Sequence, residues 1–315
     1  MLMDDFKHYT VMLNEAVDAL RCQDGKIYVD CTLGGGGHSE LILQRIQPSG
    51  RLIAFDIDDE ALAHSRERLK DYKNVTIVKS SYTNIKKELK KLGIEKITGG
   101  VIIDLGASYH QLTKQERGFS FSKEASLDMR FDMTADFSAY DVINTYKEQD
   151  LVRICSEYGE ERFSKRIAKK IVETRRAAPI RTTKELANLI MSATPRIKSD
   201  IHPATRVFQA VRIEVNNELK NVKNVLYDIL DLLDNDGIIS VLSFHSLEDR
   251  IVKQVFKSES AKCRCSNLIC TCKPPRIELV NKKPIVASNK EISENPPSRS
   301  AKLRVARCIN SRIEE

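Results

Sequence analysis

The chain has 315 residues, of which 41% are hydrophobic and 30% charged, and its formal net charge is +7. This length suffices for a large core and for two domains. No run approaches the roughly 18 consecutive apolar residues of a membrane span, and the acidic N-terminus MLMDDFKHYTVMLNEA is not a signal peptide, so we expect a soluble cytoplasmic protein with no membrane partner.

Strands and helices alternate over the first hundred residues. The predicted strands are KIYVD (26–30), RLIAFDID (51–58), NVTIVKSSY (74–82) and GGVIIDLG (99–106). The predicted helices between them are HSELILQRI (38–46), DEALAHSRERLKDY (59–72) and TNIKKELKKLG (83–93), the last closed by Gly93. This alternation predicts an α/β fold with a doubly wound parallel sheet, whose strands all end at one edge.

The alternation stops after Gly106. Residues 113–205 are rich in helix formers and turn signals, which predicts an inserted helical domain between the two parts, 1–112 and 206–315, of a discontinuous α/β domain. The second part is predicted to contain one long helix (205–233), a strand (236–244), a helix (246–256), a long loop (258–300) and a last strand (301–309). Loops of that length usually act as lids or binding surfaces.

Positive charge is concentrated in two stretches. From residue 251 to the end there are 14 Lys or Arg against 6 Asp or Glu, and ERFSKRIAKKIVETRRAAPIR covers residues 161–181. Basic surfaces attract polyanions through counterion release, so nucleic acid is a candidate partner. A solvated helix face and a charged tail are the alternative.

The eight cysteines form two groups, four scattered (Cys22, Cys31, Cys155, Cys308) and four clustered (Cys263, Cys265, Cys270, Cys272). A chain of this length needs no disulfide staples, so we expect reduced thiols. The cluster has the spacing C-x-C-x4-C-x-C, which makes its members candidate zinc ligands, although zinc knuckles usually use C-x2-C. A reduced, mobile loop is the alternative.

The stretch DCTLGGGGHSELILQRI (30–46) places four glycines between a strand and a helix. Such a turn lets backbone N–H groups and a helix N-terminus face a ligand, and a β-carbon there would push the ligand away. Asp56 ends the next strand, 22 residues after Gly34, close to the spacing at which an acid reaches ribose hydroxyls. We therefore predict a site for an adenosine-containing cofactor.

NAD and S-adenosylmethionine both fit this pattern, and two acidic residues favour the methyl donor. Asp30, four residues before Gly34, stands where a carboxylate can bind the ammonium of a methionine moiety. Asp104 ends the fourth strand, where an acid faces the adenine and the transfer site; a turn or helix cap is its alternative role.

Long motifs across the chain are similar to one known family. The motifs are HYTVMLNEAV, DCTLGGGGHSELIL, RLIAFDID, DLGASYHQL, ERGFSF, LDMRFD, YGEERFSKRIAKKIVE, HPATRVFQAVRIEVNNEL, SFHSLEDRIVK and ENPPSRSAKLRVA. Together they resemble the bacterial ribosomal RNA small subunit methyltransferase H family, from His8 to about Arg307. The resemblance implies a class I, Rossmann-like methyltransferase sheet and S-adenosyl-L-methionine as cofactor. It also implies N(4)-methylation of one cytidine in the decoding region of 16S rRNA, within the small ribosomal subunit.

The resemblance also implies a set of site residues. The implied cofactor-binding residues are Gly36, Gly37, His38, Asp56, Tyr82, Asp104 and Gln111. In the segment after the fourth strand the family usually has Ser-Ser-Pro-Gln-Leu, whereas this chain has Ser108-Tyr109-His110-Gln111-Leu112, so the shape of the base pocket is expected to differ.

The expected reaction is an in-line methyl transfer to an exocyclic amine, without a metal. Acceptors on the amine hydrogens would localise the nitrogen lone pair as the new bond forms. We expect Asp104, or backbone carbonyls between Gly106 and Ser108, to supply these acceptors, which makes Asp104 and Ser108 the candidate catalytic residues.

The target base must leave its stack to react, and RNA-binding proteins hold such bases on aromatic or Arg side chains. The candidate base contacts are Phe119, Phe121, Arg130 and His245; the candidate phosphate contacts are Arg166, Lys169, Lys170, Arg175 and Arg176. Their alternative roles are core packing for the phenylalanines, a structural hydrogen bond for His245, and a solvated helix face for the cations.

Two other functions remain as alternatives. An NAD-dependent oxidoreductase would need a hydride-transfer residue, and none is identified. A non-catalytic RNA-binding or assembly factor would be favoured by the loss of Asp56 or a filled glycine turn, and the sequence shows neither.

Overall fold

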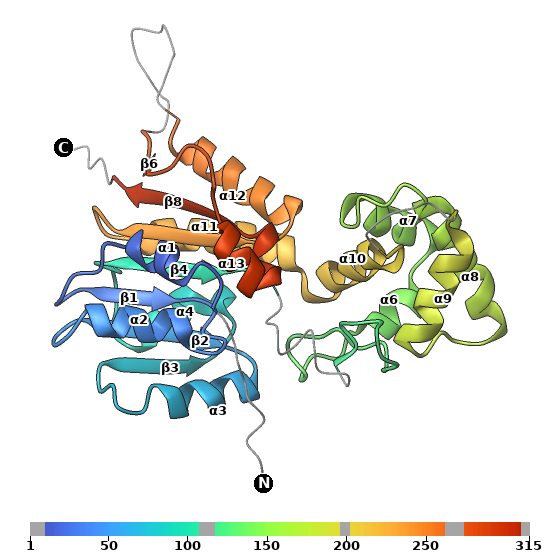
Figure 1. Cartoon of the computed structure of the whole chain (residues 1–315), viewed down its shortest axis with the longest axis horizontal. Helices are drawn as coiled ribbons and strands as arrows, with labels where there is room; N and C mark the ends of the chain where they lie inside the picture. The colour runs from blue at the N-terminus through green and yellow to red at the C-terminus, as the bar shows by residue number, and fades with distance from the viewer. Residues whose placement is uncertain (1–9, 107–116, 196–201, 262–273, 310–315) are drawn as a thin grey trace, which may run out of the picture. The chain divides into compact units, whose positions relative to one another are not determined.

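A computed structural model of the chain describes residues 10–106, 117–195, 202–261 and 274–309 (Figure 1). Its contacts divide the chain into two compact units, with boundaries after Gly106 and after Glu218. The first unit contains the sheet, and the second, between these boundaries, is helical in its described part.

One sheet organises the first unit, with the order β3-β2-β1-β4-β5-β8-β6 and with β7 paired to β8. Its strands are β1 (Ile27–Asp30), β2 (Arg51–Asp56), β3 (Val75–Lys79), β4 (Gly100–Asp104), β5 (Ile238–Ser243), β6 (Ile277–Leu279), β7 (Ile285–Val286) and β8 (Lys302–Cys308). The five strands from β3 to β5 are parallel, whereas β8 runs antiparallel to β5 and β6. The predicted doubly wound α/β fold is therefore confirmed.

Helices cover both faces of this sheet (Figure 1). They are α1 (Leu13–Asp18), α2 (Gly37–Arg45), α3 (Asp59–Arg68), α4 (Ile85–Lys91), α11 (Glu218–Leu232), α12 (Ser246–Glu259) and α13 (Asn289–Glu294), with the 3-10 turns η1 (Tyr82–Asn84) and η3 (Pro296–Ser300). Successive strand residues point to opposite faces, so Tyr28 joins the core with α1, α2 and α3, and Val29 joins the core with α4, α11 and α12. Burial on both faces explains why the central strands β1, β2, β4 and β5 are largely apolar.

The strand order reverses between β1 and β4. β1 leads to α2 on one face of the sheet, whereas the chain after β4 returns to the sheet through α11 on the other face. In folds of this type, ligands bind at the carboxyl edge of the strands where the order reverses. The glycine-rich segment after β1 lies at this edge.

The described part of the second unit is a helical cluster with its own core. It contains α6 (Ala139–Thr145), α7 (Glu148–Glu157), α8 (Ser164–Ala177), α9 (Thr183–Ala193) and α10 (Ala204–Asn216). Apolar side chains from all five helices and from the segment 119–129 form one buried cluster. Its described residues form no strand, only an isolated bridge between Ser126 and Thr182.

Two of the predicted boundaries are wrong. The single helix expected over 205–233 is two helices, because Asn217 adopts a left-handed conformation (φ 50°) that ends α10. The bidentate ion pair between Arg212 and Glu218, at 2.8 and 2.9 Å, spans this break. The loop expected over 258–300 contains β6, β7, α13 and η3 in its described part.

No helix in the described ranges is both long and apolar enough to cross a membrane. The four scattered cysteines, all of them described, carry free thiols, and the clustered cysteines lie outside the described residues.

Candidate active site at the carboxyl edge of the sheet

Three aspartates end three neighbouring strands of the first unit. Asp30 ends β1, Asp56 ends β2 and Asp104 ends β4, and β1 pairs with both of the other strands. Because these strands are parallel, their carboxyl ends meet at one edge and the carboxylates gather there. The resulting concentration of negative charge suits a cationic ligand.

Asp56 shapes the glycine turn that follows β1. Its Oδ2 atom accepts a hydrogen bond from the Gly34 amide at 2.8 Å, and its Oδ1 atom accepts from the amides of Ile57 (2.8 Å) and Asp58 (2.9 Å). Burial raises the pKa of Asp56, and these hydrogen bonds oppose that effect. Asp56 thus ties the turn after β1 to the end of β2, which is where the predicted cofactor ribose would lie.

The glycines are required by the chain's own packing. Gly34 (φ 48°) and Gly36 (φ 78°) have left-handed conformations, and Gly36 is the N-cap of α2. A β-carbon on Gly36 would lie 3.1 Å from Ser65 Oγ, and one on Gly37 would overlap the side chain of Thr10. A ligand that comes close to the backbone was the reason expected for these glycines. At Gly37 the described protein atoms already exclude a β-carbon, and at Gly36 they crowd it.

Replacing Gly37 with Ala is expected to lower the free energy of unfolding by about 1–3 kcal/mol, because overpacking a tight contact costs that much. The double variant Gly37→Ala/Thr10→Ala lacks the overlapping hydroxyl and is expected to recover most of that stability. Urea unfolding of both variants, of Thr10→Ala and of the wild type gives the four unfolding free energies of a double-mutant cycle. An equal loss with and without the Thr10 side chain would show that this contact is not the cause.

Asp30 lies beneath the turn, only 1% exposed. Its Oδ2 atom accepts from the Ser39 hydroxyl at 2.7 Å and its Oδ1 atom from the Thr32 amide at 3.0 Å. Burial, together with the nearby charge of Asp56, raises the pKa of Asp30 to about 6. The carboxylate that the sequence suggested for a ligand ammonium therefore binds groups of its own turn.

His38 and Asp104 face each other at the start of α2. The His38 Nδ1 atom lies 3.9 Å from Asp104 Oδ2, and the buried His38 ring places Nε2 3.2 Å from the Val11 carbonyl. A carbonyl only accepts, so Nε2 carries the hydrogen and Nδ1 of the neutral ring is an acceptor directed toward Asp104.

Asp104 has the most strongly perturbed pKa of these carboxylates. Its Oδ1 atom is buried and has no hydrogen-bond partner among the described residues, although the side chain as a whole remains 22% exposed. Burial, and then the negative charges of Asp30 and Glu248, raise its pKa to about 8. A buried acid that titrates near neutral pH at the carboxyl edge of such a sheet is a candidate functional group.

The remaining predicted cofactor residues divide into two groups. Tyr82 opens η1 directly after β3, and its ring packs, partly buried, against the core that also contains Ile85. It therefore lies at the carboxyl end of the strand next to β2. Gln111 and Ser108, together with Tyr109 and His110, lie outside the described residues.

The two predicted phenylalanines belong to the second unit's core. Phe119 is 7% exposed and stacks on Phe131, with ring centroids 5.5 Å apart. Phe121 is half-buried, lies edge-on to Phe208 at 5.0 Å and stacks on His202 at 4.5 Å. Core packing, the alternative role, accounts for Phe119, whereas Phe121 retains an accessible part.

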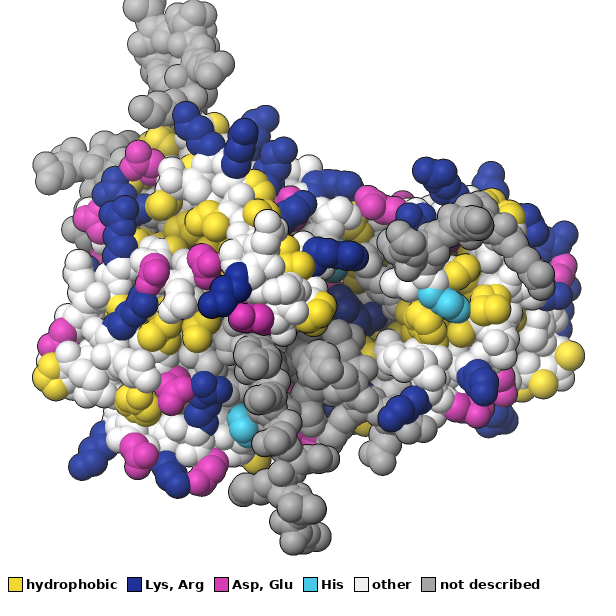
Figure 2. Space-filling view, in the orientation of Figure 1, with side chains coloured by type: hydrophobic (Ala, Val, Ile, Leu, Met, Phe, Trp, Pro, Cys, Tyr) yellow, Lys and Arg dark blue, Asp and Glu magenta, His cyan; other side chains and the backbone are white. Residues whose placement is uncertain are grey.

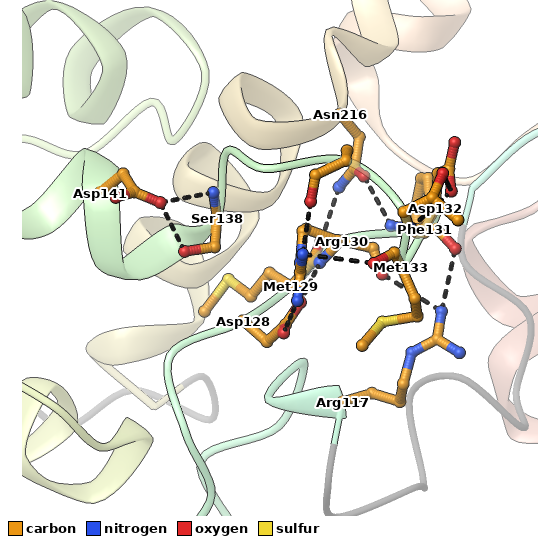
Figure 3. Close-up of polar contacts among 12 residues, drawn as sticks. Arg117, Asp128, Met129, Arg130, Phe131, Asp132, Met133, Ser138, Asp141 and Asn216 are labelled. Atoms are coloured by element: carbon orange, nitrogen blue, oxygen red, sulfur yellow. Dashed lines mark hydrogen bonds and ion pairs between the residues drawn. The ribbon is translucent and has the colours of Figure 1, made fainter.

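Arg130 lies in a tightly hydrogen-bonded segment of the second unit (Figure 3). It forms a bidentate pair with Asp128 at 2.9 and 2.7 Å and also donates to backbone carbonyls of Met133 and Ala135. Asn216 holds the same segment, accepting from the Phe131 amide and donating to the Met129 carbonyl, both at 2.8 Å. The guanidinium of Arg130 is thus used within the unit itself.

The basic residues predicted on one helix are on α8. Arg166, Lys169, Lys170 and Arg176 are exposed, and Lys169 lies 3.9 Å from Glu173. Arg175 differs, because its guanidinium donates to the Ile143 and Tyr146 carbonyls of the unit. The space-filling view shows Lys and Arg side chains distributed over the surfaces of both units (Figure 2). Four of the five predicted cations are therefore accessible to phosphate.

His245 follows β5 and caps α12, in a capping box with Glu248. Glu248 was not among the predicted site residues. It is a carboxylate only 1% exposed, whose Oε2 accepts from the amides of Phe244 (2.9 Å) and His245 (3.3 Å). A signal for it exists in HSLE, which has the capping-box spacing with His in the place of Ser or Thr.

Comparisons with known proteins identify the family of the chain. A family model described as the MraW methylase family matches residues 5–309. Two relatives are named ribosomal RNA small subunit methyltransferase H. The one from Clostridium botulinum (strain Loch Maree / Type A3) is 48% identical over 97% of this chain and 100% of its own length. The one from Caldicellulosiruptor bescii is 52% identical over 96% of this chain and 99% of its own length. A solved putative rRNA methylase from Clostridium thermocellum aligns with 96% of this chain and 99% of its own, with 14% identity and a TM-score of 0.47. The chain therefore belongs to the MraW methylase family, a family of S-adenosylmethionine-dependent methyltransferases.

Proposed function

We propose that this protein methylates the N(4) atom of one cytidine in the decoding region of 16S rRNA, in the small ribosomal subunit, with S-adenosyl-L-methionine as the methyl donor. The observation that carries the substrate is the full-length similarity to relatives named ribosomal RNA small subunit methyltransferase H. The proposal places the reaction in the cytoplasm, where the small subunit is assembled.

The described residues fit this cofactor. The cofactor carries a sulfonium and an ammonium charge, and the carboxyl edge of the sheet offers the carboxylates of Asp56 and Asp104, the latter with a buried oxygen that has no partner among the described residues. Under the proposal, Gly36, Gly37 and His38 form the turn beneath the cofactor, and Asp56 binds the ribose hydroxyls. Tyr82 packs beside the adenine, and Asp104, with Gln111 from outside the described residues, completes the site.

When bound, the cofactor supplies an electrophilic methyl group that needs no further activation. The residues of the chain must then deal with a weak nucleophile, because the lone pair of a cytosine amine is conjugated with the ring. Asp104 accepts a hydrogen bond from the amine, which localises that lone pair on nitrogen. Residues that hold the base direct the nitrogen in line with the departing bond, and such orientation supplies several kcal/mol of the barrier.

Asp104 is also the group on this chain to which we assign the amine proton. Its pKa of about 8 means that it ionises close to neutral pH, so it can take up a proton and release it again within one catalytic cycle.

We assign substrate recognition to the helical unit. The exposed cations of α8 would bind phosphates without sequence preference, and the part of Phe121 left accessible would contact a base. Arg130 is assigned to shaping its own segment of this unit, since Asp128 already binds its guanidinium.

The test is methylation of small subunits from a strain that lacks this enzyme. Incubation with the protein and labelled S-adenosylmethionine, followed by nuclease digestion and mass mapping, should give N(4)-methylcytidine at one position. Label in another nucleoside, or only in ribosomal protein, would reject the proposed substrate.

A further inference from the structure

The imidazole of His245 occupies an unusual place for its residue type. It is the N-cap of α12, a position that Ser, Thr, Asp and Asn dominate because their short side chains accept from the first turn. Here the His245 Nδ1 atom accepts from the Glu248 amide at 3.4 Å. A smaller residue would serve as well or better as a cap, so the ring calls for another explanation.

Both ring nitrogens are directed at the protein. Because Nδ1 acts as the acceptor of the cap, Nε2 carries the hydrogen of the neutral ring. Nε2 is buried and lies 3.2 Å from Glu248 Oε1, but it forms no hydrogen bond with a described residue. Glu248 therefore meets the ring at both nitrogens, once through its amide and once through its carboxylate. The hydrogen bond at Nδ1 sets the tautomer of the imidazole, and the close carboxylate restricts its rotation. Because Nε2 is buried, the exposed part of the side chain is what a ligand can contact.

The position of the pair relates it to the active site. Leu242 of β5 pairs with Asp104 of β4, so the residues that follow β5 lie beside those that follow β4 at the same edge. A β-carbon on Gly106, two residues after Asp104, would lie 3.7 Å from the Phe244 ring and 3.9 Å from Glu248 Oε1. The pair is thus on the opposite side of β4 from the glycine turn, away from the predicted cofactor ribose and next to the carboxylate assigned to the amine.

From this geometry we propose that His245 is a base-positioning residue, whose ring stacks against the flipped target base, and that Glu248 acts through His245 by fixing the ring. The proposal rests on the proposed function, because it takes the acceptor to be a planar base brought to Asp104. RNA-binding proteins commonly hold unstacked bases on aromatic rings, including His. The 12% of the His245 side chain that remains exposed is the part available for this contact.

The test compares three substitutions that separate the cap from the ring. His245→Asn keeps a capping acceptor and removes the ring, His245→Phe keeps an aromatic ring and removes the acceptor, and His245→Ala removes both. Gln254→Ala, an exposed change on the same helix, is the control. The measurements are kcat/KM for methylation of small subunits, the Kd for S-adenosylmethionine by calorimetry, and thermal unfolding.

We expect His245→Asn and His245→Ala to lower kcat/KM by about tenfold or more, the effect of losing one stacked base, while the cofactor Kd stays unchanged. His245→Phe should keep more activity than His245→Asn despite its lost cap. Wild-type activity in His245→Asn would reduce His245 to a cap and overturn the proposal. Activity of His245→Phe no higher than that of His245→Asn would overturn stacking. If the wild-type protein itself fails to methylate small subunits, the proposed function fails first, and the two failures are distinguishable.

Discussion

Replacing Asp56 with Ala is expected to weaken S-adenosylmethionine binding by about 100-fold, or about 3 kcal/mol. Two losses combine in this variant. The ribose hydroxyls lose their charged acceptor, and three backbone amides, among them that of Gly34, lose the carboxylate that orders the turn. Calorimetric titration with the cofactor measures the change directly.

The control for this variant is Asp59→Ala. Asp59 begins α3 three residues further on, its side chain is 74% exposed, and it pairs with Lys79 at 2.6 Å on the surface. Both substitutions remove one negative charge near the same strand, so a purely long-range electrostatic effect would appear in both. An unchanged Kd in Asp56→Ala, or an equal loss in both variants, would contradict the assignment of Asp56 to the ribose.

The alternating part of the fold follows from local sequence patterns. Short continuous apolar segments, each followed by a helical pattern, predict buried parallel strands, and β1 to β5 lie within the predicted segments. Gly93 ends α4 with a φ of 69°, as its position after the last apolar residue predicts.

The wrong boundaries have physical causes that periodicity does not contain. The apolar spacing continues through Asn217, so the break between α10 and α11 depends on a single left-handed residue, of a type that tolerates this conformation. The short strands β6 and β7 exist because they pair with the edge of β8, which follows them in the chain only after α13 and η3. The segment that contains them, PPRIELVNKKPIVA, has Lys and Pro on either side of apolar runs that are too short to predict strands.

In the candidate site, too, some features could be predicted from the sequence and others depend on tertiary contacts. Strand ends that carry acids could be found from sequence, because the topology brings them to one edge. The partners of each side chain could not be found, since they depend on tertiary contacts: Thr10 beside Gly37, Ser39 on Asp30, and Asp128 on Arg130. Sequence patterns therefore located the edge of the sheet where the acids meet, but they did not separate the groups that build the turn from the groups left to bind a ligand.

Replacing Asp104 with Asn is expected to lower turnover by about 100-fold or more and, at neutral pH and above, to stabilise the protein. The loss follows if Asp104 takes the amine proton, because an amide cannot do so. Single-turnover methylation under saturating cofactor measures this loss of turnover. Normal turnover would remove Asp104 from the chemistry, and weakened cofactor binding alone would show as a changed Kd with an unchanged rate.

The gain in stability follows from the pKa of Asp104. In the unfolded chain this carboxyl ionises near its ordinary value of 3.8, whereas in the folded protein its pKa is about 8. Between these values the folded state holds the extra proton, so the contribution of Asp104 to stability is full below about pH 4 and is lost as the pH rises to about 8. The amide in the Asp104→Asn variant does not titrate, so the difference in unfolding free energy between the two proteins should shift in favour of the variant as the pH rises toward about 8 and stay constant above. Asp30, with its pKa raised to about 6, is present in both proteins and adds a similar slope to each.

The same pKa predicts that cofactor binding is coupled to proton release. A cationic sulfonium favours the ionised form of Asp104, so binding near neutral pH should expel the proton that the free protein holds there. Calorimetry in two buffers of different ionisation enthalpy should then give different apparent binding enthalpies for the wild type and nearly equal ones for Asp104→Asn. S-adenosylhomocysteine, which lacks the sulfonium charge, should release less proton than S-adenosylmethionine. Equal release by the two ligands would mean that the sulfonium is not near Asp104, and the carboxylate would then have to act on the acceptor alone.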